Sequence, residues 1–236
     1  MDRFFHPELH KESQQVLLSA VESQHLVKVL RKKMGDRVEL INGQGGIAQA
    51  EVITANAKGS VLHINTFEYF DPLPYSLHMA IAPTKSNDRF EWFLEKATEI
   101  GVSQITPILC HQSERRKINL TRYEKILLSA VKQSKQYYLP KLHPLTTFQD
   151  FISQHSTAAI AHCHSGKKEP LSTLPIDQLP DTILIGPEGD FSSAEVENAV
   201  MLGLQPITLG HQRFRTETAG IVACHSIAFR KSITTS

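Results

Sequence analysis

Residues 182–200, TILIGPEGDFSSAEVENAV, join an apolar segment to an amphipathic one through a short turn. The apolar run at 182–185 predicts a strand that is covered on both faces. Gly186-Pro187-Glu188-Gly189 predicts a turn, and Ser192-x-x-Glu195 predicts a capping box at the start of a helix. A strand, a glycine turn and a helix in this order are typical of ligand-binding α/β proteins.

The acidic residues of this turn limit the kind of ligand that it could bind. Such turns usually bind phosphate, because backbone N–H groups and the positive end of the helix face it. Glu188 and Asp190 would repel a phosphate, so they favour a neutral or cationic ligand, with ribose hydroxyls as possible hydrogen-bond partners. A plain turn, with Ser192 capping the helix, explains this loop equally well.

The same alternation extends over residues 76–236. Short apolar segments predict buried strands at 77–82, 105–110, 158–163, 182–186 and 206–210. Apolar residues at helical spacing predict helices between and after them, including 88–101, 122–134 and 216–231. This order predicts an α/β fold with a mostly parallel sheet and helices on both sides.

Residues 1–70 have a β pattern instead. Residues 37–55 alternate apolar and polar side chains around a glycine turn, which predicts a hairpin, and 60–67 predicts a further strand. A short helix fits residues 23–31. Pro72 and Pro74 stop strands, so we predict a domain boundary there, with domains at 1–72 and 73–236.

Composition excludes several classes of protein. The chain has 236 residues, a net charge of +1 and 41% hydrophobic residues, enough for a proper core. No apolar run reaches the roughly 18 residues of a membrane span, and no secretory signal is expected. Three widely spaced cysteines favour a reduced, cytoplasmic protein.

Basic residues are concentrated in the middle of the chain. Residues 81–145 carry 11 Lys and Arg but only 6 Asp and Glu. The clusters at 31–33 and 115–117 make RNA or DNA a reasonable partner, although each alone is more often a solvated face. Arg3 lies beside Phe4 and Phe5, which could stack on bases or pack in the core.

Ligands of parallel sheets bind beyond the carboxyl ends of the strands, which singles out the turns at 162–166, 186–189 and 210–220. In the third turn, a helix cap and a first-turn acid explain Thr216 and Glu217. They do not explain Arg213 and Arg215, because cations at a helix N-terminus oppose its dipole. An anionic ligand or a catalytic role would explain them.

Other site chemistries lack their motifs. His162 and His164 would point to different sides of a strand from Cys163, and no second Cys/His cluster is near, so we expect no metal site. The chain has no G-x-S-x-G, no phosphate-binding G-x-x-x-x-G-K-[ST] and no G-x-G-x-x-G. Serine hydrolase, ATPase and classical dinucleotide functions therefore lose their main support.

Several segments together resemble one known family. They are QHLVKVLRKKMGDRVELINGQGG (24–46), WFLEKATEIGVSQITPILC (92–110), LIGPEGDFS (184–192), ITLG (207–210) and RFRTETAG (213–220). In this order they resemble the RsmE family of 16S rRNA (uracil-1498-N3)-methyltransferases, within the SPOUT superfamily. The resemblance implies S-adenosyl-L-methionine (AdoMet) as cofactor, which carries a sulfonium cation and no phosphate.

The resemblance also implies an architecture and partners. A C-terminal SPOUT domain with a deep trefoil knot would bind AdoMet, and a small N-terminal PUA-like β-barrel would hold RNA. The partner would be 16S rRNA in the small ribosomal subunit, and the chain would form a homodimer through the knot domain.

Carried over residue by residue, the resemblance implies three groups of site residues. The cofactor-binding residues would be Ile185, Gly186, Glu188, Gly189, Leu209, Gly210, Phe214, Thr216, Thr218 and Ala219. The catalytic residues would be Arg215 and Glu217, and the RNA-binding residues Arg3, Arg31, Lys32, Arg115 and Arg116. Two positions depart from the family: Asp190 stands where Gly is common, and Gln212 where Arg is common.

The chemistry suggests roles for the two catalytic residues. Uracil N3 is a poor nucleophile until its proton leaves, so Arg215 would stabilise the developing anion or orient the base. Glu217 would orient Arg215 or accept the proton. The uracil should be rotated out of its stack. An inactive RNA-binding protein, methylation of another base and a nucleotide hydrolase remain as alternatives.

Overall fold

The computed structural model describes residues 1–232 and divides the chain into two compact units. The N-terminal unit holds residues 1–72 together with 131–139. The C-terminal unit holds residues 73–130 and the chain from Pro140 onward. The domain limits 1–72 and 73–236 remain a prediction, and they assign residues 131–139 to the C-terminal domain.

That second segment belongs to the N-terminal unit through apolar packing. Val131 forms a cluster with Ile41 and Ile47, and Tyr137 stacks on Phe70 with ring centroids 4.0 Å apart. These contacts join residues about 60 or more positions apart in the chain. Hydrophobic periodicity reflects only local structure, so it cannot predict such contacts.

The N-terminal unit is built on one five-stranded sheet in the order β1-β3-β4-β5-β2. Its strands are β1 (Arg3–Phe5), β2 (Gln15–Leu17), β3 (Arg37–Ile41), β4 (Gly46–Thr54) and β5 (Val61–Tyr69). The predicted hairpin is confirmed, because β3 and β4 pair antiparallel from Arg37↔Glu51 to Ile41↔Ile47. Phe4 is completely buried in the core of this unit, so packing and not base stacking accounts for it.

The helical segment predicted at 23–31 begins and ends earlier, since helical turns run from Ala20 to Val29. The structure has α1 (Ala20–Gln24), which starts early because the Ser19 hydroxyl accepts a hydrogen bond from the backbone N–H of Glu22. A π-helical turn, η1 (His25–Val29), follows it directly. Arg31 then adopts a φ of 54°, which ends the helical conformation.

The C-terminal unit contains an eight-stranded sheet in which every pair is parallel. The order is β11-β13-β10-β12-β6-β7-β8, and β9 also pairs with β7. The strands are β6 (His78–Ile81), β7 (Gln104–Leu109), β8 (Lys141–Leu142), β9 (Thr146–Thr147), β10 (Ala159–Ala161), β11 (Glu169–Pro170), β12 (Thr182–Ile185) and β13 (Gln205–Thr208). All five predicted strands are present, so the predicted α/β class and parallel sheet are confirmed.

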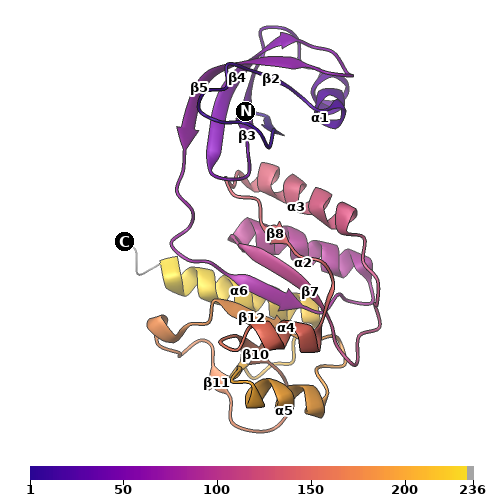
Figure 1. Cartoon of the computed structure of the whole chain (residues 1–236), viewed down its shortest axis with the longest axis vertical. Helices are drawn as coiled ribbons and strands as arrows, with labels where there is room; N and C mark the ends of the chain where they lie inside the picture. Colours follow the sequence, from indigo (N-terminus) through magenta and orange to yellow (C-terminus); the bar gives the residue numbers. More distant parts are fainter. Residues whose placement is uncertain (233–236) are drawn as a thin grey trace. The chain divides into compact units, whose positions relative to one another are not determined.

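Helices cover both faces of this sheet (Figure 1). They are α2 (Asn87–Ile100), α4 (Phe148–Gln154), α5 (Ser193–Met201) and α6 (Thr216–Ser232). The chain also has α3 (Leu120–Ser134), whose Tyr123 packs on Phe90 of α2, and a short 3₁₀ turn, η2 (Ile176–Gln178). Ala80 and Ala82 pack with residues of α4 and α5, whereas the side chain of Ile81 lies against Gly220 of α6. Side chains of a strand alternate between faces, so one strand serves both helical layers.

Local signals set the helix ends. The predicted capping box is confirmed, because the Ser192 hydroxyl accepts from the Glu195 backbone and the Glu195 carboxylate accepts from the Ser192 backbone. Gly101 ends α2 with a φ of 101°. No helix in residues 1–232 is long and apolar enough to cross a membrane. The knot remains a prediction.

Candidate functional site

Three turns that the sequence singled out lie at one edge of the parallel sheet. Strand β10 lies between β12 and β13, and its last residue, Ala161, pairs with Ile185 on one side and Ile207 on the other. All three strands are parallel, so the turns that follow them leave the sheet at the same edge. Two adjoining hollows, of about 240 and 280 Å³, open among these turns.

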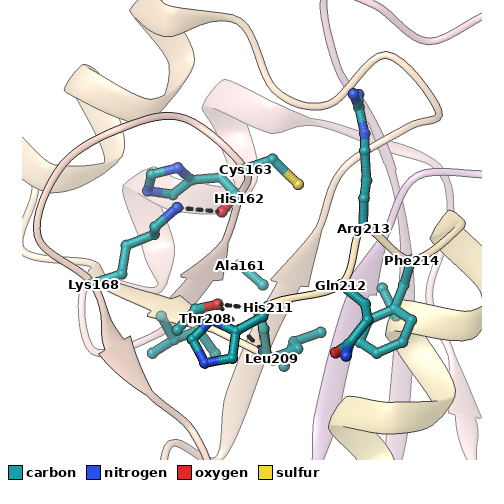
Figure 2. A pocket seen from close by; sticks show the side chains of 13 residues that line it. Ala161, His162, Cys163, Lys168, Thr208, Leu209, His211, Gln212, Arg213 and Phe214 are labelled. Atoms are coloured by element: carbon teal, nitrogen blue, oxygen red, sulfur yellow. Dashed lines mark hydrogen bonds between the residues drawn. The ribbon is translucent and has the colours of Figure 1, made fainter.

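The first hollow lies between the turn after β10 and the loop after β13 (Figure 2). It is lined by Ala161, His162, Cys163, Lys168, Ile207, Thr208, Leu209, Gly210, His211, Gln212, Arg213, Phe214 and Ala219. The predicted cofactor residues Leu209, Gly210, Phe214 and Ala219 are therefore brought together here. The sequence had singled out the turn at 162–166 without assigning Cys163 or Lys168 to a site.

The second hollow adds the turn after β12 and the start of α6. It shares Ala161, Cys163, Arg213, Phe214 and Ala219 with the first and adds Ile185, Gly186, Pro187, Glu188, Asp190, Arg215 and Thr216. Predicted cofactor residues from two turns thus meet the predicted catalytic Arg215. Gly189, Glu217 and Thr218 are outside the lining of these two hollows.

The carboxylates of Glu188 and Asp190 both accept hydrogen bonds from backbone N–H groups. The Glu188 carboxylate accepts a 2.8 Å hydrogen bond from the backbone N–H of Lys85, in the loop after β6. The Asp190 carboxylate accepts from the backbone N–H groups of Cys163 and Phe191, at 2.7 and 2.8 Å. Both side chains therefore join neighbouring loops, and a cationic ligand is not needed to account for them.

One position of this turn has an unusual backbone conformation, and another is crowded by a neighbouring side chain. Asp190 has a φ of 68°, a left-handed conformation that favours glycine. A Cβ at Gly189 would lie 2.2 Å from the Gln112 side-chain oxygen, so the Gln112 side chain would have to move.

The turn after β10 is held by its own lysine. The Lys168 ammonium donates to the carbonyl oxygens of His162 and His164, at 3.1 and 2.7 Å, and the first of these bonds is drawn in Figure 2. His164 Nε2 donates to the carbonyl oxygen of Phe191, at 2.6 Å. Both ring nitrogens of His162 are buried and have no hydrogen-bond partner among the described residues. Burial, reinforced by Lys168, lowers the pKa of His162, so its ring is neutral at pH 7.

The start of α6 is tied to the turn after β12. The Thr216 hydroxyl donates a buried 3.0 Å hydrogen bond to the carbonyl oxygen of Gly186. Arg213 and Arg215 are exposed and form no ion pair within residues 1–232. Glu217 is buried, with Oε1 3.8 Å from Nε of Arg89 in α2, while Oε2 has no partner in the described part of the chain. The carboxylate is thus paired with Arg89 and not with Arg215.

The predicted RNA-binding residues of the N-terminal unit differ in their surroundings. Arg3 is buried; its guanidinium donates to the Glu39 carboxylate at 3.1 and 3.2 Å and to the Gln136 carbonyl oxygen at 3.0 Å. Lys32 forms a 2.9 Å ion pair with Asp2. Arg31 is exposed.

The two arginines after β7 differ in the same way. Arg115 is half-buried and donates to the carbonyl oxygens of Thr84 and Lys85, at 2.9 and 2.6 Å. Arg116 is exposed and has no hydrogen bond or ion pair with the described residues.

Comparison with known sequences identifies two domains. Residues 71–228 match a family described as RNA methyltransferase domain, and residues 21–64 match RNA methyltransferase PUA domain. The chain is similar to the ribosomal RNA small subunit methyltransferase E of Buchnera aphidicola subsp. Acyrthosiphon pisum, with 32% identity over 86% of this chain and 83% of that protein.

Solved structures agree with these matches. A probable rRNA-methyltransferase from Porphyromonas gingivalis superposes with a TM-score of 0.88 and 36% identity, over 99% of this chain and 100% of that one. Ribosomal RNA small subunit methyltransferase E from Neisseria gonorrhoeae, bound to S-adenosyl methionine, has a TM-score of 0.85 and 26% identity over 97% of both chains. A TrmH/SpoU tRNA modifying enzyme from A. aeolicus, with a TM-score of 0.50, 12% identity and coverage of 70% of this chain and 79% of that one, shares the fold alone.

Proposed function

Because the chain belongs to the ribosomal RNA small subunit methyltransferase E family, we propose that it methylates N3 of one uracil, position 1498 of 16S rRNA. The chain is an AdoMet-dependent rRNA methyltransferase with the SPOUT class of fold. The choice of base and position rests on the resemblance of its motifs to the RsmE family.

One observation carries the assignment of the site. The hollows at the carboxyl edge of the sheet adjoin each other and share Ala161, Phe214 and Ala219. A molecule as long as AdoMet could extend through both. The Glu188 and Asp190 carboxylates line the second hollow and accept hydrogen bonds from backbone N–H groups, and carboxylates at this place disfavour a phosphate and suit a cofactor that carries none. The residues present therefore fit the cofactor.

We assign cofactor binding to residues of three segments. Backbone groups at Ile185–Gly186 and Leu209–Gly210 and the side chain of Phe214 would contact it, next to Ala219. Two further residues would act by holding the loops, because the Thr216 hydroxyl and the Glu188 carboxylate make hydrogen bonds between loops. Gly189 and Thr218 do not line the hollows, so we assign them to the support of these loops and not to direct contact with the cofactor. When bound, AdoMet supplies an electrophilic methyl group.

We assign to Arg215 the stabilisation of the uracil anion. It is exposed at the second hollow and forms no ion pair with the described residues, so its guanidinium is available to a substrate oxygen. The N3 proton must leave as the N–CH₃ bond forms, and a guanidinium beside the base stabilises the negative charge that develops on it. Glu217, paired with Arg89, is then a positioning residue at the start of α6.

We also propose the partners and location. Small-subunit rRNA would be held by Arg31, Lys32 and Arg116, while Arg3 and Arg115 use their guanidinium groups inside the protein. The protein would act in the cytoplasm, where small subunits are assembled, as a homodimer through the C-terminal unit. Light scattering during gel filtration tests the dimer.

The experiment that tests the function uses tritiated AdoMet. The protein is incubated with small ribosomal subunits that lack the modification and, in parallel, with naked 16S rRNA, and the label is mapped by nuclease digestion and mass spectrometry. Label at N3 of one uracil supports the proposal. Binding of AdoMet without any label would instead favour an inactive RNA-binding protein, and label at another base would correct the target.

A further inference from the structure

The loop after β7 carries two consecutive arginines whose surroundings are opposite. Arg115 is half-buried and donates to two backbone carbonyl oxygens, whereas Arg116 is exposed. We propose that Arg115 is a positioning residue for the cofactor turn at 186–189, acting through the loop after β6 and Glu188, and that it does not contact RNA phosphate. This inference rests on the proposed AdoMet site.

The first step of the connection joins Arg115 to the loop after β6. Its Nε donates to the carbonyl oxygen of Thr84 at 2.9 Å, and its Nη2 donates to that of Lys85 at 2.6 Å. Because the donor is ionised, these hydrogen bonds are stronger than those between neutral groups. Thr84 is fully buried, and its hydroxyl donates to the Ser86 carbonyl oxygen at 2.7 Å, so Arg115 binds an ordered segment.

The second step joins that loop to the cofactor turn. The backbone N–H of Lys85 donates to the Glu188 carboxylate at 2.8 Å. The Lys85 ammonium pairs with Glu114 at 2.9 Å, next to Arg115 in the chain. Lys85 is therefore held at its carbonyl by Arg115 while its N–H holds Glu188, which lines the second hollow.

The loop after β7 also reaches the same turn directly. Gln112 lies so close to Gly189 that a Cβ on this glycine would meet its side chain. The backbone N–H of His111 donates to the Glu195 carboxylate at 2.8 Å, at the start of α5. These contacts do not depend on Arg115, and they show that the loop after β7 supports the cofactor turn.

The same geometry argues against a phosphate contact for Arg115. Arginine recognises phosphate with two parallel N–H donors, and one of the edges that can do so in Arg115, Nε with Nη2, already donates to carbonyl oxygens. Arg116 has no partner among the described residues, so it is the residue of this pair that suits a phosphate.

The test compares Arg115→Ala with its neighbour Arg116→Ala. AdoMet affinity is measured by calorimetry, and affinity for 16S rRNA by filter binding at two salt concentrations. We expect Arg115→Ala to weaken AdoMet binding by about tenfold and to change RNA affinity less than about twofold. Arg116→Ala should do the reverse and lower the salt dependence of RNA binding. Unchanged AdoMet affinity in Arg115→Ala, or a loss of RNA affinity as large as in Arg116→Ala, overturns the inference.

Two variants of Glu188 guard against a simple folding defect. Glu188→Gln keeps a side-chain oxygen for the Lys85 N–H and should therefore lose less AdoMet affinity than Glu188→Ala does. Glu188→Ala removes it and should resemble Arg115→Ala, and combining the two Ala changes should add little, because both break one connection. The connection is contradicted if the losses of AdoMet affinity in Arg115→Ala and Glu188→Ala add fully in the double variant. It is also contradicted if Glu188→Gln and Glu188→Ala lose the same AdoMet affinity. If wild-type protein itself does not bind AdoMet, the proposed function fails first.

Discussion

The carboxylate of Asp190 accepts a 2.7 Å hydrogen bond from the backbone N–H of Cys163. This bond joins the turn after β12 to the turn after β10, and both residues line the second hollow. Asp190 holds this position in a left-handed conformation, with a φ of 68°. A short polar side chain tolerates that conformation when it bonds to nearby backbone.

Substitutions at Asp190 should separate backbone strain from the hydrogen bond. Asp190→Ala keeps the strain and loses both backbone contacts, so we expect a loss of about 1–2 kcal/mol of stability and weaker AdoMet binding. Asp190→Asn keeps an acceptor and should stay near the wild type, while Asp190→Gly relieves the strain but frees the turn after β10. Chemical denaturation and calorimetry measure both effects. An alanine variant as stable as the asparagine variant would contradict this account.

Cys163 should be the reactive thiol of the protein. It is exposed and lines both hollows, whereas Cys110 and Cys224 are buried, and burial raises the pKa of both thiols. We expect a maleimide to modify Cys163 first, AdoMet to slow this reaction, and the modified protein to lose cofactor binding.

Peptide mass spectrometry identifies the modified residue, and Cys163→Ser serves as the control that retains AdoMet binding without fast labelling. Equal labelling rates with and without saturating AdoMet would place Cys163 outside the cofactor site.

Arg215→Ala should slow methyl transfer without affecting cofactor binding. Loss of one group that stabilises a developing anion typically costs about 10²–10³ in rate. Single-turnover transfer to the small subunit measures the rate, and calorimetry measures AdoMet affinity. Arg213→Ala is the control, because Arg213 is also exposed and lines both hollows. A full transfer rate in Arg215→Ala would remove Arg215 from the mechanism.

His78 should make the stability of the protein depend on pH. Burial, with His143 and His155 nearby, lowers the pKa of His78 from 6.5 to about 4. The unfolded chain therefore binds a proton first as the pH falls, and stability decreases from about pH 6.5 down to about pH 4. This one group contributes about 3 kcal/mol at most.

Urea unfolding at several pH values between 7.5 and 4.5 measures this slope. His78→Asn should flatten it, whereas substitution of the exposed His111 should not. The lowered pKa of His143 leaves a residual slope in the variant. A His78→Asn variant with the full wild-type slope would exclude His78 as its source.

The sequence was sufficient for features that depend on neighbours in the chain. Apolar runs located strands β6, β7, β10, β12 and β13, and Ser192-x-x-Glu195 located the start of α5, because strand burial and helix capping leave short-range patterns. The order of strands and helices also led to the parallel sheet and to the turns at its carboxyl edge. The cofactor and the reaction were predicted from the family motifs, because the chemistry of the residues alone did not identify them.

The partner of each charged side chain was decided by residues far away in the sequence. Glu188 binds the backbone of Lys85, Arg115 binds Thr84 and Lys85, and Glu217 lies beside Arg89. A charged side chain in a motif is equally compatible with a ligand, with solvent or with an internal partner. Folding chooses among these, because a group that loses water must find a hydrogen bond wherever the packed chain offers one.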